Sequence, residues 1–210
     1  MPTPVTFYTN PMSRGQIVRW ALEESGTAYE TVILEYGAGM KAPDFLAINP
    51  MGKVPAIRHE GRVVTECAAI CAYLAEAFPE AGLVPTADER AAYYRWMFFA
   101  AGPLEQATTA RAMSWTTEED RSAMLGFGSY DDTVAAVEAL LNGSDYVCGS
   151  RFTMADVYVG SHIEWGLGYG TLPKRPAFEA YAERLAGRAA HKRGRAIDAA
   201  LIAEREAVES

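Results

Sequence analysis

The amino-acid sequence predicts an α/β domain followed by an all-α domain. Strand and helix patterns alternate up to residue 78, whereas only helical patterns follow residue 86. A block of alternating elements before a block of helices indicates two domains of different class. Two prolines and a glycine lie between the blocks, and such residues interrupt regular structure. We therefore expect domains over residues 1–79 and 87–210, joined by a linker over 80–86.

The N-terminal domain is expected to have the order β-α-β-α-β-β-α. Gly26 follows the first helical pattern and is typical of a helix C-cap. Glu60-Gly61 predicts a hairpin turn between the last two strands. The successive elements are expected over residues 5–8, 15–25, 29–34, 44–48, 54–58, 62–64 and 66–78.

The C-terminal domain contains five helical patterns. Thr153 and Asp156 fit a capping box at the start of the third, with Asp in place of the usual Glu or Gln. This motif predicts the beginning of a buried helix and no chemistry. The patterns cover residues 87–114, 119–142, 153–166, 176–187 and 190–205.

Charge and cysteine content narrow the functional classes. The net charge of −8 argues against nucleic acid, whose phosphates require a basic surface. No apolar run approaches the ~20 residues of a membrane span, and no signal peptide is evident at the N-terminus. The three cysteines form no CxxC pair and have no zinc-site spacing. We expect a cytoplasmic protein with reduced thiols and no metal.

A first motif surrounds Pro55 in the run Gly-Lys-Val-Pro-Ala-Ile. A proline at the start of a strand cannot donate to the ladder. A cis bond before proline costs only ~0.5–1 kcal/mol, and it would turn the backbone of Val54 toward a peptide-like ligand. An ordinary trans proline on an edge strand explains the same residues.

A second motif is Thr65-Glu66-Cys67, at a strand-to-helix turn. Unpaired N–H groups at a helix start favour an anion. A ligand carboxylate would dock on the N–H of Cys67, and Glu66 would hold a ligand ammonium. Alternatively, Thr65 caps the helix and Glu66 suits its first turn.

A third motif runs from Tyr8 to Gly15, at the first strand-to-helix turn. The Ser13 hydroxyl would donate a hydrogen bond to a thiolate there. Lowering a thiol pKa from ~8.5 to ~6.5 requires about 2.7 kcal/mol. A charge-assisted hydrogen bond contributes ~1.5–3 kcal/mol and a helix N-terminus ~0.3–1 kcal/mol. The alternative is that Ser13 simply caps the helix.

In this order and at these separations, the motifs resemble the cytosolic glutathione transferase superfamily over essentially the whole chain. The runs beginning at Asn10, Asn49 and Phe152 look like those of bacterial members with a serine-type site. The resemblance implies a thioredoxin-like N-terminal domain, a helical bundle domain and a homodimer. It also implies that glutathione is a cosubstrate and that no cofactor is tightly bound.

The resemblance also implies roles for particular residues. Ser13 would stabilise the glutathione thiolate, with Tyr8 and Asn10 as alternatives. The tripeptide would be bound by Val54 before cis-Pro55, by Glu66 and Cys67 at the γ-glutamyl group, and by Lys53 and Lys41 near the glycyl carboxylate. A second-substrate pocket between the domains would be lined by Met12, Tyr36, Arg111, Trp115 and Trp165.

Cys67 departs from the family pattern, which commonly has Glu-Ser where this chain has Glu66-Cys67. A thiol is a weak donor, so we expect modest affinity for glutathione; an exposed, redox-active Cys67 is the alternative. The expected activity is attack of the glutathione thiolate on small hydrophobic electrophiles. The alternative is a non-catalytic protein that binds glutathione or a hydrophobic ligand. The lack of CxxC argues against a thioredoxin-type oxidoreductase.

Overall fold

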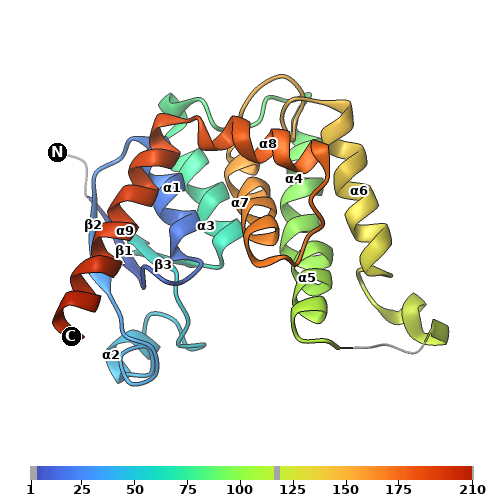
Figure 1. Ribbon diagram of the computed structural model, residues 1–210. Coiled ribbons are helices and arrows are strands. Elements are labelled where there is room, and N and C mark those ends of the chain that lie inside the picture. Colours follow the sequence, from blue (N-terminus) through green and yellow to red (C-terminus); the bar gives the residue numbers. More distant parts are fainter. Residues whose placement is uncertain (1–3, 116–118, 210) are drawn as a thin grey trace. The chain divides into compact units, whose positions relative to one another are not determined.

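The structure is a computed structural model that describes residues 4–115 and 119–209. The chain divides into two compact units (Figure 1). Unit 1 comprises Met1–Leu83 with Gly187–Ser210, and unit 2 comprises Val84–Ala186. Each unit is considered by itself below. No helix in the described ranges combines the length and apolar character needed to cross a membrane.

Unit 1 contains a four-stranded mixed sheet in the order β2-β1-β3-β4. Strand β1 pairs parallel with β2 and antiparallel with β3, and β3 pairs antiparallel with β4. Glu60 and Gly61 form the predicted hairpin turn, and both have positive φ, as a type I′ turn requires. The strands are β1 (Val5–Thr9), β2 (Tyr29–Ile33), β3 (Ala56–His59) and β4 (Arg62–Thr65).

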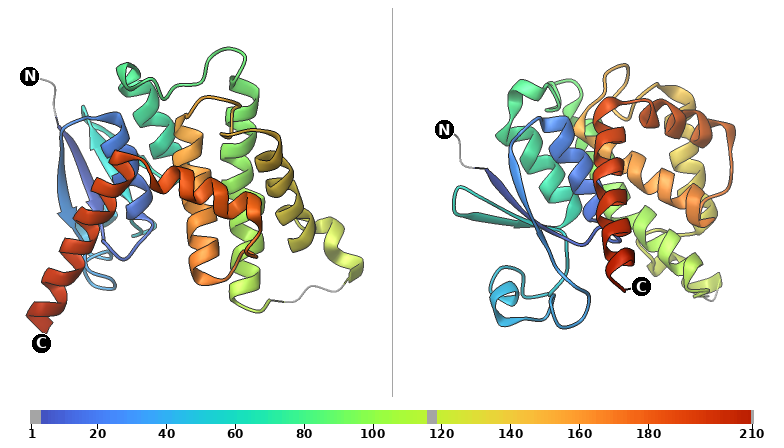
Figure 2. Two further views of the ribbon diagram at one scale, coloured as in Figure 1. Left: turned by 45° about the horizontal axis from the view of Figure 1, so that its top comes forward. Right: turned by 60° about the vertical axis from the view of Figure 1, so that its left-hand side comes forward.

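The described part of unit 1 also contains a 3₁₀ segment (Pro79–Ala81) and four α-helices. They are α1 (Gly15–Ser25), α2 (Pro43–Leu46), α3 (Cys67–Ala77) and α9 (Ala189–Glu209). Helix α1 packs against both α3 and α9, and the three lie side by side on one face of the sheet (Figure 2). The α/β order predicted for this part of the chain is confirmed.

Helix α9 is joined to α1 by a buried ion pair. Arg19 Nε lies 2.7 Å from Asp198 Oδ1, and the two side chains are 1% and 4% exposed. The guanidinium also lies over the Phe7 ring of β1. Packing therefore groups α9 with the sheet, although the sequence pattern placed all residues from 87 onward in one helical domain. A helical periodicity identifies the element but not the unit on which it packs.

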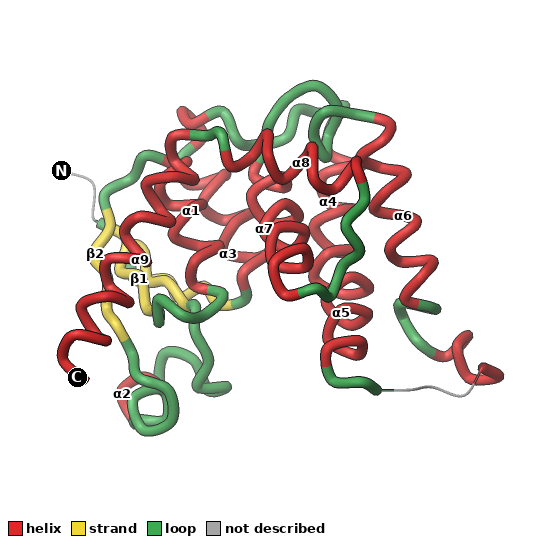
Figure 3. The backbone as a smooth tube through the Cα atoms, viewed as in Figure 1, coloured by secondary structure: helices red, strands yellow, loops and turns green. Residues whose placement is uncertain are grey.

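Unit 2 is helical, as predicted (Figure 3). The pattern over 87–114 is divided into α4 (Arg90–Phe99), a π-helical segment (Ala100–Leu104) and α5 (Glu105–Ala112). Pro103 lies inside the π-helical segment, and proline removes a hydrogen bond and crowds the preceding turn of an α-helix. The remaining helices are the 3₁₀ segment Glu119–Met124, α6 (Tyr130–Gly143), α7 (Met154–Tyr169) and α8 (Pro176–Ala186).

The predicted capping box is present at the start of α7. The buried Asp156 carboxylate accepts hydrogen bonds from Thr153 N–H at 2.8 Å, Val147 N–H at 2.7 Å and the Tyr181 hydroxyl at 2.7 Å. Burial raises the pKa of Asp156 above its usual value, against these bonds. Asp156 therefore connects the start of α7 to α8 and to the segment before α7.

Candidate functional site

The Ser13 hydroxyl is buried in the turn between β1 and α1. It donates a hydrogen bond to the Asn10 carbonyl at 2.7 Å and accepts one from the Gly15 N–H at 2.9 Å. The same carbonyl also accepts the Ser13 N–H at 3.0 Å. The hydroxyl proton can therefore turn toward a ligand without leaving the Asn10 carbonyl unpaired.

Gly15 determines how closely this turn folds. A Cβ atom at this position would lie 1.8 Å from Thr9 Oγ1 and 3.0 Å from Ser13 Oγ. Thr9 is fully buried at the end of β1, so it has little room to move. A glycine is required here because any side chain would displace the groups around the Ser13 hydroxyl.

Asn10 has a different environment from Ser13. Its Nδ2 donates to the Leu34 carbonyl at 2.9 Å, and its Oδ1 accepts the Met12 N–H at 3.0 Å. Both ends of the buried side chain therefore fix the turn and join it to the segment after β2.

Tyr8 lies on the other face of β1 from Thr9, since successive side chains of a strand alternate. Its ring packs against Phe45 of α2, with 5.8 Å between ring centroids, beside a small apolar cluster that includes Met40 and Ala56. The atoms nearest to a Cβ built at Gly15, at the start of α1, belong to Thr9 and Ser13 and not to Tyr8. The Tyr8 side chain therefore packs against α2.

The Val54–Pro55 peptide bond is cis, as the family resemblance implies. It directly precedes β3, whose first residue is Ala56. The Asn49 amide donates to the Lys53 carbonyl at 2.8 Å and holds this segment in place.

Lys41 lies against the same segment. Its Nζ donates to the Met51 carbonyl at 2.7 Å. Gly52 has a φ of +56°, and a Cβ atom there would lie 2.6 Å from the Met40 carbonyl and 2.8 Å from Lys41 Nζ. Both lysine side chains, Lys41 and Lys53, are exposed. The structure therefore brings two cations to neighbouring loops beside the cis bond.

Glu66 has an unusual backbone conformation at the start of α3, with φ 67° and ψ 121°. Such a conformation costs a non-glycine residue about 1–3 kcal/mol and is typical of functional sites. Glu66 is the N-cap residue, and no side chain caps this helix. The alternative in which Thr65 caps it is therefore wrong, and the first N–H groups of α3 lack a side-chain cap.

The two strand-to-helix turns meet at Cys67. Its thiol donates to the Arg14 carbonyl across 3.7 Å. The Ser13 turn and the Glu66 turn are therefore adjacent, and one small ligand can contact both. This proximity could not be inferred from the sequence, because Arg14 and Cys67 are 53 residues apart in the chain.

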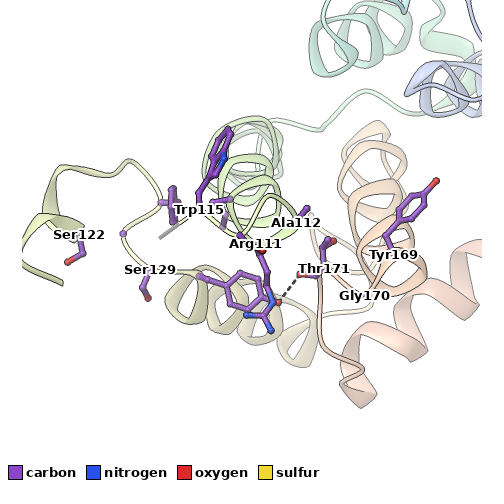
Figure 4. Close-up of a pocket in the computed structure, with 14 residues that line it drawn as sticks. Arg111, Ala112, Trp115, Ser122, Ser129, Tyr169, Gly170 and Thr171 are labelled. Atoms are coloured by element: carbon purple, nitrogen blue, oxygen red, sulfur yellow. Dashed lines mark hydrogen bonds between the residues drawn. The ribbon is translucent and has the colours of Figure 1, made fainter. Parts of the chain in front are cut away.

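The expected second-substrate residues fall into two groups. In unit 1, the side chains of Met12 and Tyr36 are exposed, and the Tyr36 hydroxyl donates a hydrogen bond to the backbone carbonyl of Met12 at 3.3 Å. In unit 2, Arg111 and Trp115 line one pocket (Figure 4). Trp165 is not part of the pocket lining, but its ring meets the lining residue Tyr169 edge-on.

Sequence reasoning missed several residues that shape these sites. Gly15 carries no motif signal for its contact with Thr9, because that contact depends on how the turn folds. Tyr130, Tyr169 and Thr171 line the unit 2 pocket, and they come from segments far from Arg111. No rule based on spacing along the sequence predicts that these residues lie together.

The first part of the chain matches a known protein family. Residues 3–76 match the family described as glutathione S-transferase, N-terminal domain. A glutathione S-transferase of Escherichia coli O157:H7, GstA, is 30% identical over 125 residues, which span 58% of this chain and 61% of that protein. Glutathione S-transferase GST-4.5 of Xanthomonas campestris pv. campestris is 29% identical over 85% of this chain and 91% of its own length.

A solved structure resembles nearly the whole chain. It is a glutathione transferase homologue from Sulfitobacter with bound glutathione, 30% identical, with a TM-score of 0.71. The similarity covers 90% of this chain and 95% of that one. The likeness therefore includes the helices of unit 2 as well as the sheet of unit 1.

Proposed function

Because the chain belongs to the cytosolic glutathione S-transferase superfamily, we propose that it binds glutathione in unit 1 and transfers it to small electrophiles. The thiol proton leaves to solvent, and the thiolate forms a carbon–sulfur bond. In a substitution, the leaving group departs with the electron pair of the broken bond. The observation that carries this proposal is the Ser13 hydroxyl, which is buried and oriented at the start of α1.

Ser13 acts as the donor to the sulfur in this proposal. Its oxygen is held by the Gly15 N–H, so the hydroxyl proton is the part that moves. The proton turns from the Asn10 carbonyl to the thiolate, and that carbonyl keeps its bond from the Ser13 N–H. Tyr8 and Asn10 are less suited, because Tyr8 packs with α2 and both ends of Asn10 are engaged.

The expected pKa shift of the glutathione thiol follows from this exchange. A hydrogen bond to a thiolate contributes ~1.5–3 kcal/mol, whereas the neutral bond given up contributes ~0.5–1.5 kcal/mol. The N-terminus of α1 adds ~0.3–1 kcal/mol. At the middle of these three ranges the balance is about 1.9 kcal/mol, which lowers the thiol pKa by about one to two units, enough to form thiolate near neutral pH.

The remaining contacts in the proposal involve the peptide groups of glutathione. Val54 pairs with the cysteinyl backbone, next to the cis bond at Pro55. The N-terminus of α3, which begins at Cys67, receives the γ-glutamyl carboxylate, and the Glu66 carboxylate receives its ammonium. Lys41 and Lys53 attract the glycyl carboxylate at the neighbouring loops.

We also propose that the protein is a cytoplasmic homodimer. Support for a dimer comes from the family and from large apolar side chains that are exposed in each unit. Phe98 and Tyr94 lie one turn apart on α4 and are 72% and 41% exposed, and Met51 in unit 1 is 66% exposed. Light scattering tests this directly: the wild-type protein should have twice the mass of one chain, and Phe98→Glu should reduce it.

The test of the activity is the pH dependence of kcat/KM for conjugation of chlorodinitrobenzene. The wild-type profile should rise with an apparent pKa about one to two units below that of free glutathione. Ser13→Ala should lower kcat/KM about tenfold or more at neutral pH and lose most of that shift. Tyr8→Phe should match the wild type. Glutathione binding without conjugation would instead favour the non-catalytic binding protein.

A further inference from the structure

The pocket of unit 2 has a volume of about 740 Å³, within the usual range for small-molecule sites. It lies at the C-terminal end of α5 and is completed by the start of α6 and the loop after α7. Figure 4 shows Arg111 between the segment of Ser129 and the loop of Thr171. All of these lining residues belong to unit 2.

Arg111 is the only charged side chain among the described residues that line this pocket. Its guanidinium carbon lies 4.5 Å from the centroid of the Tyr130 ring. A guanidinium stacked on a ring uses its face, which leaves the N–H groups at its edge available for a planar anion.

Tyr130 is itself fixed in place. Its hydroxyl donates to the Thr171 carbonyl at 2.8 Å, and burial raises its pKa above the usual value. The phenol therefore stays neutral and gives Arg111 a rigid platform. Asp131 and Arg175 also act electrostatically on Tyr130, in opposite directions.

Aromatic rings supply the rest of a binding surface. Trp115 and Tyr169 line the pocket and are 65% and 81% exposed, and Phe127 lies in the same lining. Large exposed rings beside a cavity offer stacking area for a flat apolar ligand. Small residues such as Ala107, Ala110 and Gly170 leave the space that such a ligand would occupy.

We propose that this pocket binds planar organic carboxylates, with the carboxylate on Arg111 and the flat apolar part against Trp115 and Tyr169. Arg111 then selects for anionic partners over neutral ones of the same shape. That this ligand is the second substrate of the enzyme rests on the proposed function; the binding itself does not. The pair of naphthoate and naphthamide separates the two contributions, since they share a ring system and differ in charge.

Calorimetric titration without glutathione tests the proposal. Wild-type protein should bind naphthoate about tenfold or more tightly than naphthamide, the ratio expected of one charge-assisted hydrogen bond. Arg111→Met should abolish that preference. Lys174→Met is the matched control, because it removes one positive charge three residues from Thr171 at an exposed position outside the lining, and it should keep the preference.

Equal wild-type affinities for the two ligands, or an unchanged preference in Arg111→Met, would overturn the proposal. Arg111→Gln provides a second replacement if the methionine variant does not fold. It should likewise abolish the preference for naphthoate over naphthamide. Thiolate formation on glutathione is measured separately in the same variants. Absence of the naphthoate preference in the wild-type protein, together with normal thiolate formation, contradicts only this inference. A naphthoate preference that depends on Arg111, without thiolate formation in the wild type, contradicts only the proposed function.

Discussion

The Cys67 thiol donates a hydrogen bond to the Arg14 carbonyl across 3.7 Å. This contact joins the first turn of α3 to the turn that holds Ser13, immediately before α1. Two groups that the sequence separates widely, the Ser13 hydroxyl and the start of α3, are thereby brought close together. Glutathione suits such an arrangement, because its thiol is on the central cysteinyl residue and the neighbouring γ-glutamyl group carries a carboxylate.

The three cysteines should differ sharply in reactivity. Burial raises the pKa of the Cys71 thiol well above its usual value and that of Cys148 to about 11. Both thiols therefore stay protonated at neutral pH, and a protonated thiol is a poor nucleophile. Cys67 and Cys148 are both half-buried, so the raised pKa of Cys148 is what separates these two thiols. Iodoacetamide at neutral pH should modify Cys67 first, as read by mass spectrometry.

Glutathione analogues provide the control for this experiment. S-methylglutathione lacks a free thiol, so it does not consume the reagent, and it should protect Cys67 if the γ-glutamyl group binds there. Denatured protein should be modified at all three positions. Equal modification of Cys148 and Cys67 in the folded protein would contradict the raised pKa of the Cys148 thiol.

Gly15→Ala should disturb the site without touching any ligand. The added Cβ would overlap Thr9 Oγ1 at 1.8 Å, and crowding of a packed interior typically costs ~1–3 kcal/mol. Urea unfolding should show that loss, and glutathione affinity should fall with it. Gly26→Ala is unsuitable as a control, because Gly26 has a φ of +64°; Gly102→Ala, where the Cβ meets no atom within 4 Å, should cost less.

Asp156→Ala should destabilise unit 2 severely. It leaves the N–H groups of Val147 and Thr153 and the Tyr181 hydroxyl without their acceptor. Each buried unpaired donor costs about 1–3 kcal/mol, so we expect a loss of at least about 3 kcal/mol. Tyr181→Phe removes one of these bonds and should cost about 1 kcal/mol.

The same carboxyl group predicts a pH dependence. Burial raises the pKa of folded Asp156 above its unfolded value, so the folded protein holds that proton more tightly. The contribution of Asp156 to stability is therefore complete below the unfolded pKa of ~3.8 and declines as pH rises through the folded pKa. Denaturation curves of wild type and Asp156→Ala across acidic pH should diverge most at the low end of that window. Parallel curves would contradict the assignment.

The ion pair between Arg19 and Asp198 should be costly to break from one side. Arg19→Met leaves the Asp198 carboxylate buried without its partner, and such losses are about 3–5 kcal/mol. Replacing both residues, as in Arg19→Met with Asp198→Leu, should recover much of that loss. The exposed pair of Arg62 and Glu60 is the comparison: Arg62→Met should change stability by less than about 1 kcal/mol.

The sequence predicted the sheet unit well because its signals are local. Gly26 ends α1, and Glu60-Gly61 forms the turn of the hairpin where expected. The long pattern over 87–114 was less informative, since periodicity continues through Pro103 while the backbone widens into a π-helical segment there.

The candidate site was predicted only in part, because its geometry is not local. The motifs identified Ser13, Glu66 and Cys67, but not the contact that joins their turns. The sequence also could not show that the Ser13 hydroxyl is already bonded to the Asn10 carbonyl, which reduces the expected pKa shift. The unit 2 pocket combines residues from three α-helices, a 3₁₀ segment and the loops beside them, and only Arg111 and Trp115 were anticipated.

The central claim is that the Ser13 hydroxyl stabilises the glutathione thiolate. Ultraviolet difference absorbance of bound glutathione, titrated with pH, measures that thiolate directly. Wild type and Tyr8→Phe should form it with a pKa about one to two units below the ~8.5 of a free thiol, whereas Ser13→Ala should return it to about that value. A Ser13→Ala titration identical to the wild type, or an unshifted wild-type thiol, would contradict the account.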